Sequence, residues 1–440
     1  MRADLTMLRA RWLDAFKHAD TVVRTGAVTR VMPTYVEADG PSAALGSLCM
    51  VGGQVMAEVV KIEQGLVTLA PYAPVTSLCI GDRVEAIRIG SDVPVGSALL
   101  GRVVDPLGFP IDGGRPIGVM GERWPLAGKE TGALDRITPT QALETGCRAI
   151  DGMLTLGIGQ RVGIFAGSGV GKTTLLGGLA THIQADVCVL CLVGERGREA
   201  DEFWHRSLSE QARKRSVMVV ATSDRPAIMR ARSVSLALAY AEYFRAQGKH
   251  VLLLLDSVTR YALALREIGL AAGEPPTVRA YTPGVFAALP KIVERCGALR
   301  QGGATTAIMT VLTETDDIDD PMAETLRALL DGHIVLTRAL AEQGQFPAID
   351  VPRSVSRVFR HVTTAEEKAL AARAVGQLAL YEASRTLVES GLYVAGSHPA
   401  LDRALANRPA LVQFLKQDLD IPTPRAQAIT ELAALLGVSS

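Results

Sequence analysis

The sequence lacks an excess of charge of either sign and is poor in aromatic residues. Its 440 residues carry 46 Lys or Arg against 46 Asp or Glu, so the formal net charge is zero. Proteins whose main affinity is for a phosphate backbone usually carry a basic excess, and the balance argues against that class. With aromatic residues at 5% and apolar residues at 48%, we expect a globular chain whose cores consist of Ala, Leu and Val.

Long hydrophobic runs and paired cysteines are missing as well. The densest central apolar run, Val187–Val193, has seven residues, whereas a membrane-spanning helix needs about 20. Charged side chains interrupt the first twenty residues, so no secretory signal is expected. The six cysteines are scattered. Cys188 and Cys191 form a CxxC, but within the strand-like run VCVLCLV, which favours a buried strand over a zinc or redox site. We therefore expect a reduced, cytoplasmic protein.

Changes in pattern divide the chain into five segments. An amphipathic helix is expected at 1–20, a small β-barrel of short β-branched runs at 21–92, and a Gly/Pro/Asp-rich connector at 93–145. Between 146 and 362, short apolar runs alternate with helical stretches, which predicts a parallel sheet covered on both faces. Residues 363–440 show helical patterns alone. The predicted fold class is α/β, with a barrel before the sheet domain and a helical domain after it.

The first helix has one apolar stripe, because Leu5, Leu8, Trp12 and Phe16 follow one another at steps of three and four. Such a stripe can pack on its own domain or dock a partner. The sequence leaves both open.

A glycine-rich loop follows the strand-like run RVGIFA and precedes a helical run. It matches the phosphate-binding pattern GxxxxGK[ST], except that Ala166 stands in place of the first glycine. Backbone N–H groups of such a loop surround phosphates at a helix N-terminus. We expect Lys172 to reach the β- and γ-phosphates of a nucleotide and the Thr173 hydroxyl to hold Mg²⁺. The candidate nucleotide-binding residues here are Gly167, Ser168, Gly169, Val170, Gly171, Lys172, Thr173 and Thr174.

Two further strand ends carry acidic residues. Asp256 closes the run HVLLLLD, at the edge of the sheet where α/β proteins bind ligands, and is our candidate Mg²⁺ ligand. Glu195 follows the run DVCVLCLVG and is our candidate general base or water-orienting residue. Glu199 competes for that role, although its ordinary place would be the first turn of the next helix.

Several stretches resemble the cytoplasmic ATPase of type III protein export, which serves flagella and injectisomes and is similar to the catalytic subunits of rotary ATP synthases. They are FAGSGVGKTTLL, GERGREADEF, LLLLDSVTRYALALREIGLAAGEPP, LDGHIVLTRALAEQGQFPAID and SVSRV. The connector LLGRVVDPLGFPIDG fits as well. AGSGVGKT with Ala first, and GERGRE in place of GERTRE, favour the export branch. The resemblance implies a RecA-like central domain.

The resemblance also implies residue roles. Glu195 matches the catalytic glutamate, with Arg196 as its neighbour near the phosphates. Arg357, in SVSRV, matches the arginine finger that a neighbouring subunit inserts at the γ-phosphate. Phe346 matches the aromatic residue that stacks on adenine. Tyr393 is a candidate second wall, although a core tyrosine of the helical domain would look the same.

The implied activity is Mg²⁺-dependent ATP hydrolysis by a homohexameric ring that energises type III protein export and unloads substrates from chaperones at the export gate. The implied partners are a stator or regulator at the N-terminal helix, an export-gate membrane protein, a stalk protein and chaperone–substrate complexes, with no nucleic acid. The ring would lie in the cytoplasm, peripheral at the inner face of the bacterial inner membrane. Whether it would serve a flagellum or an injectisome stays open.

Three alternative classes of protein share parts of this pattern. A rotary ATP synthase subunit would need a second, different chain. A ring RNA translocase would need a basic barrel face, yet residues 26–90 contain only Arg30, Lys61, Arg83 and Arg88 as basic residues. A non-catalytic nucleotide-binding subunit would be expected to lack the glutamate at 195. One departure from the expected family pattern is Ala280, where a glycine would be expected.

Overall fold

The computed structural model describes residues 23–88, 92–117, 121–313 and 320–438. The amphipathic helix expected at residues 1–20 lies outside the described residues. Two compact units, residues 1–91 and 92–440, make up the chain, and each is described by itself.

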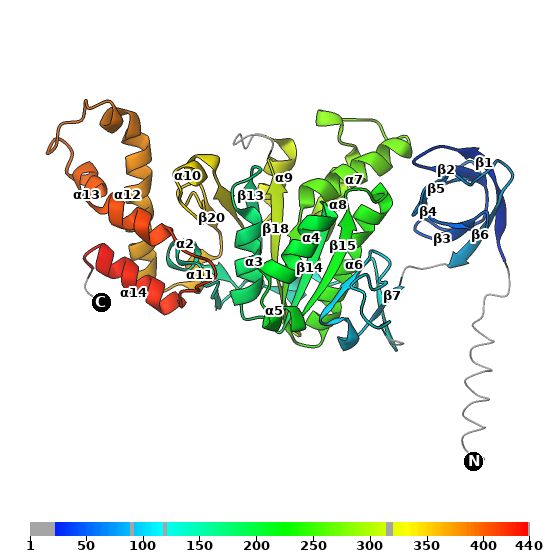
Figure 1. The fold of residues 1–440 in the computed structure, drawn as a ribbon, viewed down its shortest axis with the longest axis horizontal. Coiled ribbons are helices and arrows are strands. Elements are labelled where there is room, and N and C mark those ends of the chain that lie inside the picture. Colours follow the sequence, from blue (N-terminus) through cyan, green and yellow to red (C-terminus); the bar gives the residue numbers. More distant parts are fainter. Residues whose placement is uncertain (1–22, 89–91, 118–120, 314–319, 439–440) are drawn as a thin grey trace, which may run out of the picture. The chain divides into compact units, whose positions relative to one another are not determined.

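The first unit is a closed β-barrel, as the sequence predicts. Its strands follow one another around the barrel in the order β1-β2-β5-β4-β3-β6 (Figure 1). Strand β4 shows why the barrel closes on an apolar core, since Val55, Ala57 and Val59 are buried and alternate with less buried residues. The strands are β1 (Thr25–Val31), β2 (Val36–Asp39), β3 (Leu48–Val51), β4 (Val55–Glu63), β5 (Leu66–Pro71) and β6 (Arg83–Arg88).

The second unit is built on a central sheet in the order β20-β19-β13-β18-β16-β14-β15-β8. The strands along this order pair in parallel, except that β20 runs antiparallel to β19. Two short strands join the same sheet beside this path: β17 (Gly297–Leu299) runs antiparallel to β18, and β10 (Arg136–Ile137) runs antiparallel to β17. The strands are β8 (Arg102–Val104), β13 (Arg161–Ala166), β14 (Val187–Glu195), β15 (Ser216–Thr222), β16 (His250–Asp256), β18 (Ala304–Leu312), β19 (Gly332–Leu336) and β20 (Val355–Ser356). The predicted parallel sheet is confirmed.

Both faces of this sheet are covered, which explains the continuous apolar runs of its strands. Every residue of β14 is buried, and its side chains alternate between two cores. Val189 and Cys191 belong to the core under helices α6 (Ala227–Ala246), α7 (Val258–Ala271), α8 (Pro283–Glu294) and α9 (Pro321–Leu329). Cys188 and Leu190 face the other core, under α2 (Arg148–Met153), α3 (Lys172–His182) and α4 (Gly197–Glu202). The short helix α5 (Glu210–Lys214) precedes β15. Burial raises the pKa of both thiols to about 12, so the CxxC is part of the core.

The segment expected as a connector takes part in the sheet domain. Strand β8 pairs with β15 at the sheet edge. Strands β7 (Asp92–Val95) and β9 (Glu122–Pro125) form a separate two-stranded sheet, where Trp124 Nε1 donates a 3.0 Å hydrogen bond to Glu242 of α6. The remaining short strands are β11 (Ala142–Leu143) and β12 (Leu156–Gly157).

The C-terminal region is helical, as predicted. Thr364 and Glu367 form a capping box at the start of the long helix α12, a device typically worth about 1 kcal/mol. Leu370, Phe414 and Leu432 bring three helices of this region into the α3-side core. The helices from residue 338 onward are α10 (Arg338–Glu342), α11 (Phe359–Val362), α12 (Ala365–Glu389), α13 (Pro399–Leu415) and α14 (Arg425–Leu435).

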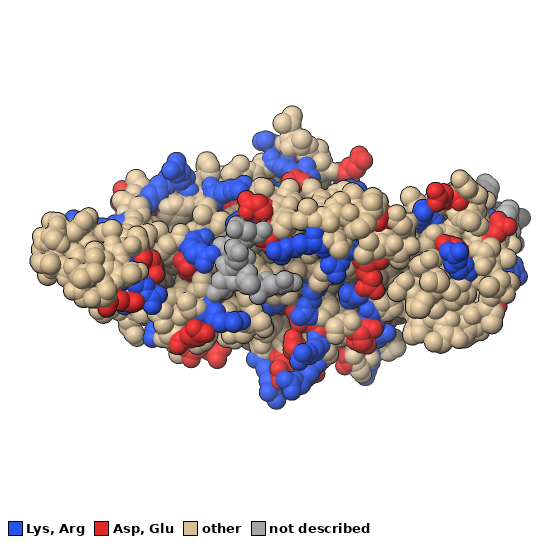
Figure 2. Space-filling model, turned by 90° about the horizontal axis from the view of Figure 1, so that it is seen from above, with Lys and Arg blue, Asp and Glu red and all other residues tan. Residues whose placement is uncertain are grey.

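Figure 2 shows one face of the molecule, on which the coloured Lys and Arg side chains are interspersed with Asp and Glu in small groups. Within the described residues, none of the helices combines the length and the apolar character needed to cross a membrane.

Candidate active site

The glycine-rich loop joins β13 to α3 at the carboxyl edge of the sheet. Gly169 and Gly171 have φ of 78° and 86°, a left-handed conformation that favours glycine. Buried Val170 anchors the loop, whereas Ser168 and Gly169 are exposed. Helix α3 begins at Lys172, and Thr173 follows in its exposed first turn. The loop therefore opens toward solvent with a helix N-terminus at its end, which suits an anionic phosphate.

The structure brings three of the predicted site residues together. Lys172 Nζ lies 2.5 Å from Asp256 Oδ1 and 3.6 Å from Glu195 Oε1. The strands that end in the two carboxylates, β14 and β16, are parallel neighbours, so both acids reach the same edge as the loop. The Thr310 hydroxyl of β18 donates a 2.6 Å hydrogen bond to Asp256 Oδ1. Lys172 therefore lies between the two acids at the mouth of the loop.

Arg260 is a site residue that the sequence analysis missed. Its Nη1 lies 3.0 Å from Glu195 Oε2 and also donates to the carbonyl of Gly194. Ser257 caps α7 by accepting a hydrogen bond from the Arg260 backbone N–H, which places Arg260 in the first turn beside the end of β14. The string DSVTR after a strand carries that signal, since Ser three residues before Arg predicts an N-cap.

Glu195 is distinguished from its competitor by burial. Glu195 is 6% exposed, whereas the Glu199 side chain is 44% exposed and pairs loosely with Arg196 at 3.9 Å. Burial raises the pKa of Glu195 above the usual range, and hydrogen bonding with Glu199 and the charge of Asp256 raise it further. Lys172 and Arg260 oppose that rise in pKa. The geometry therefore groups Glu195, not Glu199, with Lys172.

Two predicted residues lie outside this group. The Arg196 side chain is 82% exposed and makes its ion pair with Glu199. Arg357 follows β20 and is exposed, and its guanidinium donates to the carbonyl oxygens of Arg327 at 2.9 Å and Ala328 at 3.4 Å. Within the described residues, Arg357 thus bonds to the end of α9 and makes no hydrogen bond or ion pair with the Lys172 cluster of its own chain.

Phe346 lies beside the loop. Its ring is 47% exposed, and a Cβ added at Gly171 would meet it at 3.4 Å. The Phe346 carbonyl accepts a 2.9 Å hydrogen bond from the backbone N–H of Gln417. The segment of the helical region next to Phe346 is thus the one around Gln417.

The structure does not bring Tyr393 to Phe346, and this expectation needs correction. Tyr393 follows α12, and its hydroxyl donates a 2.8 Å hydrogen bond to Asp402 near the start of α13. Figure 1 shows the loop between α12 and α13 at the end of the helical hairpin far from α3. Because α12 has 25 residues, it carries this loop roughly 37 Å along its axis. Leu419, by contrast, packs on α3, where its Cβ would lie 3.2 Å from a Cβ at Gly178.

Ala280, where a glycine would be expected, lies in a left-handed backbone segment. Arg279 and Ala280 both adopt left-handed conformations, with φ of 50° and 58°. Side chains with a Cβ disfavour this region by roughly 1–2 kcal/mol, which explains why a glycine would be expected at 280.

The oxygens at the site suit Mg²⁺. A threonine hydroxyl and a carboxylate are hard ligands, and Mg²⁺ is usually bound by one or two protein groups together with substrate phosphates. Thr173 and Asp256 supply such a pair at the loop. Across the described residues, no cluster of three or more His, Cys, Asp or Glu is suited to a metal ion, so a dedicated all-protein metal cage is not what this part of the chain provides.

Comparison with known proteins agrees with this geometry. Residues 146–356 match the model of the ATP synthase alpha/beta family, nucleotide-binding domain, and residues 363–434 match the T3SS EscN ATPase C-terminal domain. The flagellum-specific ATP synthase of Bacillus subtilis is 44% identical over 434 residues, which are 97% of this chain and 98% of that protein. The SPI-2 type 3 secretion system ATPase of Salmonella typhimurium is 47% identical over 402 residues, 91% and 92% of the two chains.

Solved structures extend the likeness to the fold. The assembled ATPase EscN from the type III secretion system of enteropathogenic E. coli has a TM-score of 0.90 and 41% identity, covering 93% of this chain and 100% of that one. The same ATPase in complex with its central stalk EscO has a TM-score of 0.86 and 40% identity, again over 93% and 100%. The chain thus belongs to the ATPase family of type III secretion and flagellar protein export, whose members are ATP hydrolases.

Proposed function

We propose that this ATPase hydrolyses ATP with Mg²⁺ in a homohexameric ring and thereby energises type III protein export, flagellar or injectisome. The observation that carries the proposal is the position of Lys172 between Asp256 and Glu195 at the mouth of the glycine-rich loop. Family membership supports the activity. The Mg²⁺ ion, the ring and the export role are further parts of the proposal, which go beyond that activity.

The residues of the loop and of the strand ends have different roles in ATP hydrolysis. When ATP binds in the loop, the Lys172 ammonium leaves the carboxylates of Asp256 and Glu195 and contacts the β- and γ-phosphates. Thr173 and Asp256 would hold Mg²⁺, which would neutralise charge on the phosphates. Glu195, whose pKa is raised by burial, accepts or orients the proton of the attacking water. Arg260 holds Glu195 against the end of β14. Phe346 stacks on the adenine, and the exposed Arg196 lies near the phosphates.

The site is completed from a neighbouring subunit. Arg357 is exposed, and among the described residues it makes no hydrogen bond or ion pair with the Lys172 cluster of its own chain. This supports a role as arginine finger for the next chain. One chain would present its glycine-rich loop and another its Arg357, so the contact is head-to-tail and closes as a ring. An arginine finger typically contributes about 10³–10⁵-fold to turnover. The name of the EscN structure, an assembled ATPase, supports assembly.

The remaining assignments follow the family. A stalk protein is a partner because EscN has been solved with its central stalk EscO. A stator or regulator at the N-terminal helix, an export-gate membrane protein and chaperone–substrate complexes complete the proposed partners. The ring would lie in the cytoplasm, peripheral at the inner membrane. Domain boundaries are proposed at residues 21–92, 93–145, 146–362 and 363–440.

The test is ATP turnover per chain, measured over a wide range of chain concentration with Mg²⁺ and with excess EDTA. Turnover that rises with concentration and disappears with EDTA is expected, because isolated chains lack a finger. Lys172→Ala should lose turnover by roughly 10³-fold or more, with circular dichroism unchanged. Hydrolysis retained by that variant would overturn the proposed site. Turnover independent of concentration, from chains shown to be monomeric, would overturn the shared site.

A further inference from the structure

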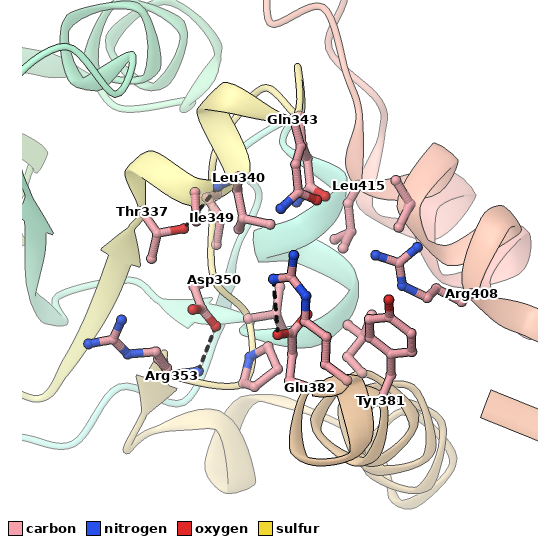
Figure 3. Close-up of a pocket in the computed structure, with 17 residues that line it drawn as sticks. Thr337, Leu340, Gln343, Ile349, Asp350, Arg353, Tyr381, Glu382, Arg408 and Leu415 are labelled. Atoms are coloured by element: carbon pink, nitrogen blue, oxygen red, sulfur yellow. Dashed lines mark hydrogen bonds and ion pairs between the residues drawn. The ribbon is translucent and has the colours of Figure 1, made fainter. Parts of the chain in front are cut away.

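A cavity of about 170 Å³ lies in the second unit, and none of its lining residues belongs to the glycine-rich loop. It opens between the segment 337–353 and helices α12 and α13 (Figure 3). Its wall is apolar in part, formed by Leu340, Ile349, Leu378, Val412 and Leu415. Polar and charged side chains form the rest of the wall, so the cavity offers contacts to both the apolar part and the polar end of a small ligand.

Arg408 supplies an uncompensated positive charge at this cavity. Its guanidinium carbon lies 4.0 Å from the centre of the Tyr381 ring, and Figure 3 shows both side chains beside the cavity. Arg408 is half-buried. Throughout the described parts of the chain, no acceptor makes a hydrogen bond or ion pair with Arg408. Arg385 in the same lining differs, because it pairs with Glu389 at 2.7 Å.

The charges on the other side of the cavity restrict what can bind. Asp350 accepts a hydrogen bond from the Arg353 backbone N–H at 3.2 Å, and Glu382 lies 4.0 Å from Arg385. Two carboxylates in the lining would repel a phosphate dianion. A monoanion that reaches Arg408 while its apolar part covers the leucines meets less of that repulsion, and Arg385 partly offsets the charge of Glu382. A carboxylate also matches the fork of a guanidinium.

We propose that this cavity binds a compact organic monocarboxylate. Its carboxylate pairs with Arg408 and accepts a hydrogen bond from the Tyr381 hydroxyl, and its apolar part contacts Leu340 and Leu415. The ligand is a free small acid or the C-terminal carboxylate of a peptide with an apolar last residue. The proposal goes beyond ATP hydrolysis and does not depend on it.

Occupancy of the cavity would reach the nucleotide site through the chain itself. Gln345 lines the cavity and is 4% exposed, and Phe346 follows it directly beside Gly171. A ligand that packs against Gln345 restrains the segment that carries Phe346. We therefore expect the ligand to change the KM for ATP more than kcat.

The experiment is calorimetric titration of the full chain, without nucleotide, with 4-methylpentanoate and with its neutral analogue 4-methylpentanamide. We expect saturable binding of the acid with a Kd on the order of 1 mM, the affinity available to so few atoms. The amide should bind about tenfold more weakly or worse, because it has no negative charge to pair with the Arg408 guanidinium. Equal binding of the two compounds, or no saturable binding of the acid, would overturn the proposal.

Single substitutions test whether the acid binds in this cavity. Arg408→Leu should weaken binding of the acid about tenfold or more, whereas Arg403→Leu, on an exposed position of the same helix, should leave it unchanged. Tyr381→Phe keeps the ring under Arg408 and should cost a smaller factor, so it serves if Arg408→Leu fails to fold. Unchanged affinity in Arg408→Leu or Tyr381→Phe would place the acid elsewhere and contradict the proposal.

Peptides separate the two sources of the carboxylate. Acetyl-Gly-Gly-Leu with a free C-terminus is compared with the same peptide amidated. Tighter binding of the free peptide than of 4-methylpentanoate assigns the cavity to a polypeptide end, and binding of the small acid alone assigns it to a free acid. Binding of the free and amidated peptides with the same measurable affinity would exclude recognition of a peptide's C-terminal carboxylate.

Discussion

The guanidinium of Arg260 lies 3.0 Å from the carboxylate of Glu195 and at the same time donates to the carbonyl of Gly194. The arginine therefore fixes both the charge and the position of the proposed base at the end of β14. A general base must face the water that it activates, and a displacement of about 1 Å can lower turnover roughly 10²-fold.

Replacement of this arginine tests that role. Arg260→Ala should lower kcat by roughly 10²-fold, the cost expected for a base misplaced by about 1 Å, with a smaller change in the KM for ATP. Loss of the positive charge should also move the acid limb of the pH profile to higher pH, because Arg260 lowers the pKa of Glu195. Arg260→Lys keeps the positive charge, so it should return the acid limb part of the way to its original pH without restoring the full kcat.

The outcome that contradicts a positioning role is specific. If Arg260→Ala lowers kcat but leaves the acid limb where it is, the arginine acts on something other than Glu195. Arg266→Ala, in the same helix α7, is the matched control and should leave both the rate and the limb unchanged.

The pH dependence of the unmodified chain follows from burial of Glu195. Its pKa is raised, and only the ionised carboxylate can accept the proton of water. Turnover should therefore be lost, as pH falls, well above the ordinary glutamate value of about 4.3. The check is kcat/KM from about pH 5 to 9 at constant ionic strength. The Glu195→Gln variant should have a low kcat/KM that does not change with pH across that range. If the unmodified chain loses activity only at the ordinary glutamate pKa, the assignment of Glu195 as the base is contradicted.

Gln417 ties the helical region to the nucleotide site. Its backbone N–H donates to the Phe346 carbonyl, its Oε1 accepts from the Arg148 N–H at 2.8 Å, and its Nε2 donates to the Gly146 carbonyl at 2.8 Å. Gln417→Ala should raise the KM for ATP about tenfold, because the segment that orients Phe346 loses side-chain bonds worth about 1 kcal/mol each. We expect kcat to change less.

Gln413→Ala is the control for that experiment, since Gln413 is exposed on the adjoining turn of α13 and should behave as the unmodified chain. A similar KM in both variants would show that the contact with Phe346 does not depend on the Gln417 side chain. Steady-state kinetics with ATP and with GTP would add a second readout, because a displaced Phe346 should alter the preference between bases.

Local patterns in the sequence predicted the parts of the site that local rules determine. The glycine-rich loop and the acids at two strand ends depend on the residues around them and on one rule of parallel sheets, and Lys172, Glu195 and Asp256 meet as that rule requires. The barrel and the helical region were predicted for the same reason, because their periodicities are local.

Tertiary contacts escaped prediction. Arg260 and Gln417 act through groups that are distant in sequence. The N-cap at Ser257 predicts the place of Arg260 on α7, but no local pattern specifies its partner Glu195 or the partners of Gln417. Tyr393 was misplaced because proximity to adenine depends on the length and direction of α12. Strand β8 has three residues, too few for an alternating pattern, so its place at the edge of the sheet could be read only from the structure.

The central claim is that each catalytic site is shared by two chains, and mixing of inactive variants tests it most directly. Glu195→Gln chains keep Arg357, and Arg357→Ala chains keep Glu195. Random hybrid rings would then hold complete sites at about a quarter of their interfaces, so turnover should return to roughly that fraction of the unmodified rate. Lys172→Ala mixed with Glu195→Gln, whose lesions lie on the same side of the interface, should stay inactive. No recovery in the first mixture, with hybrid assembly verified by light scattering and a tagged chain, would contradict the shared site.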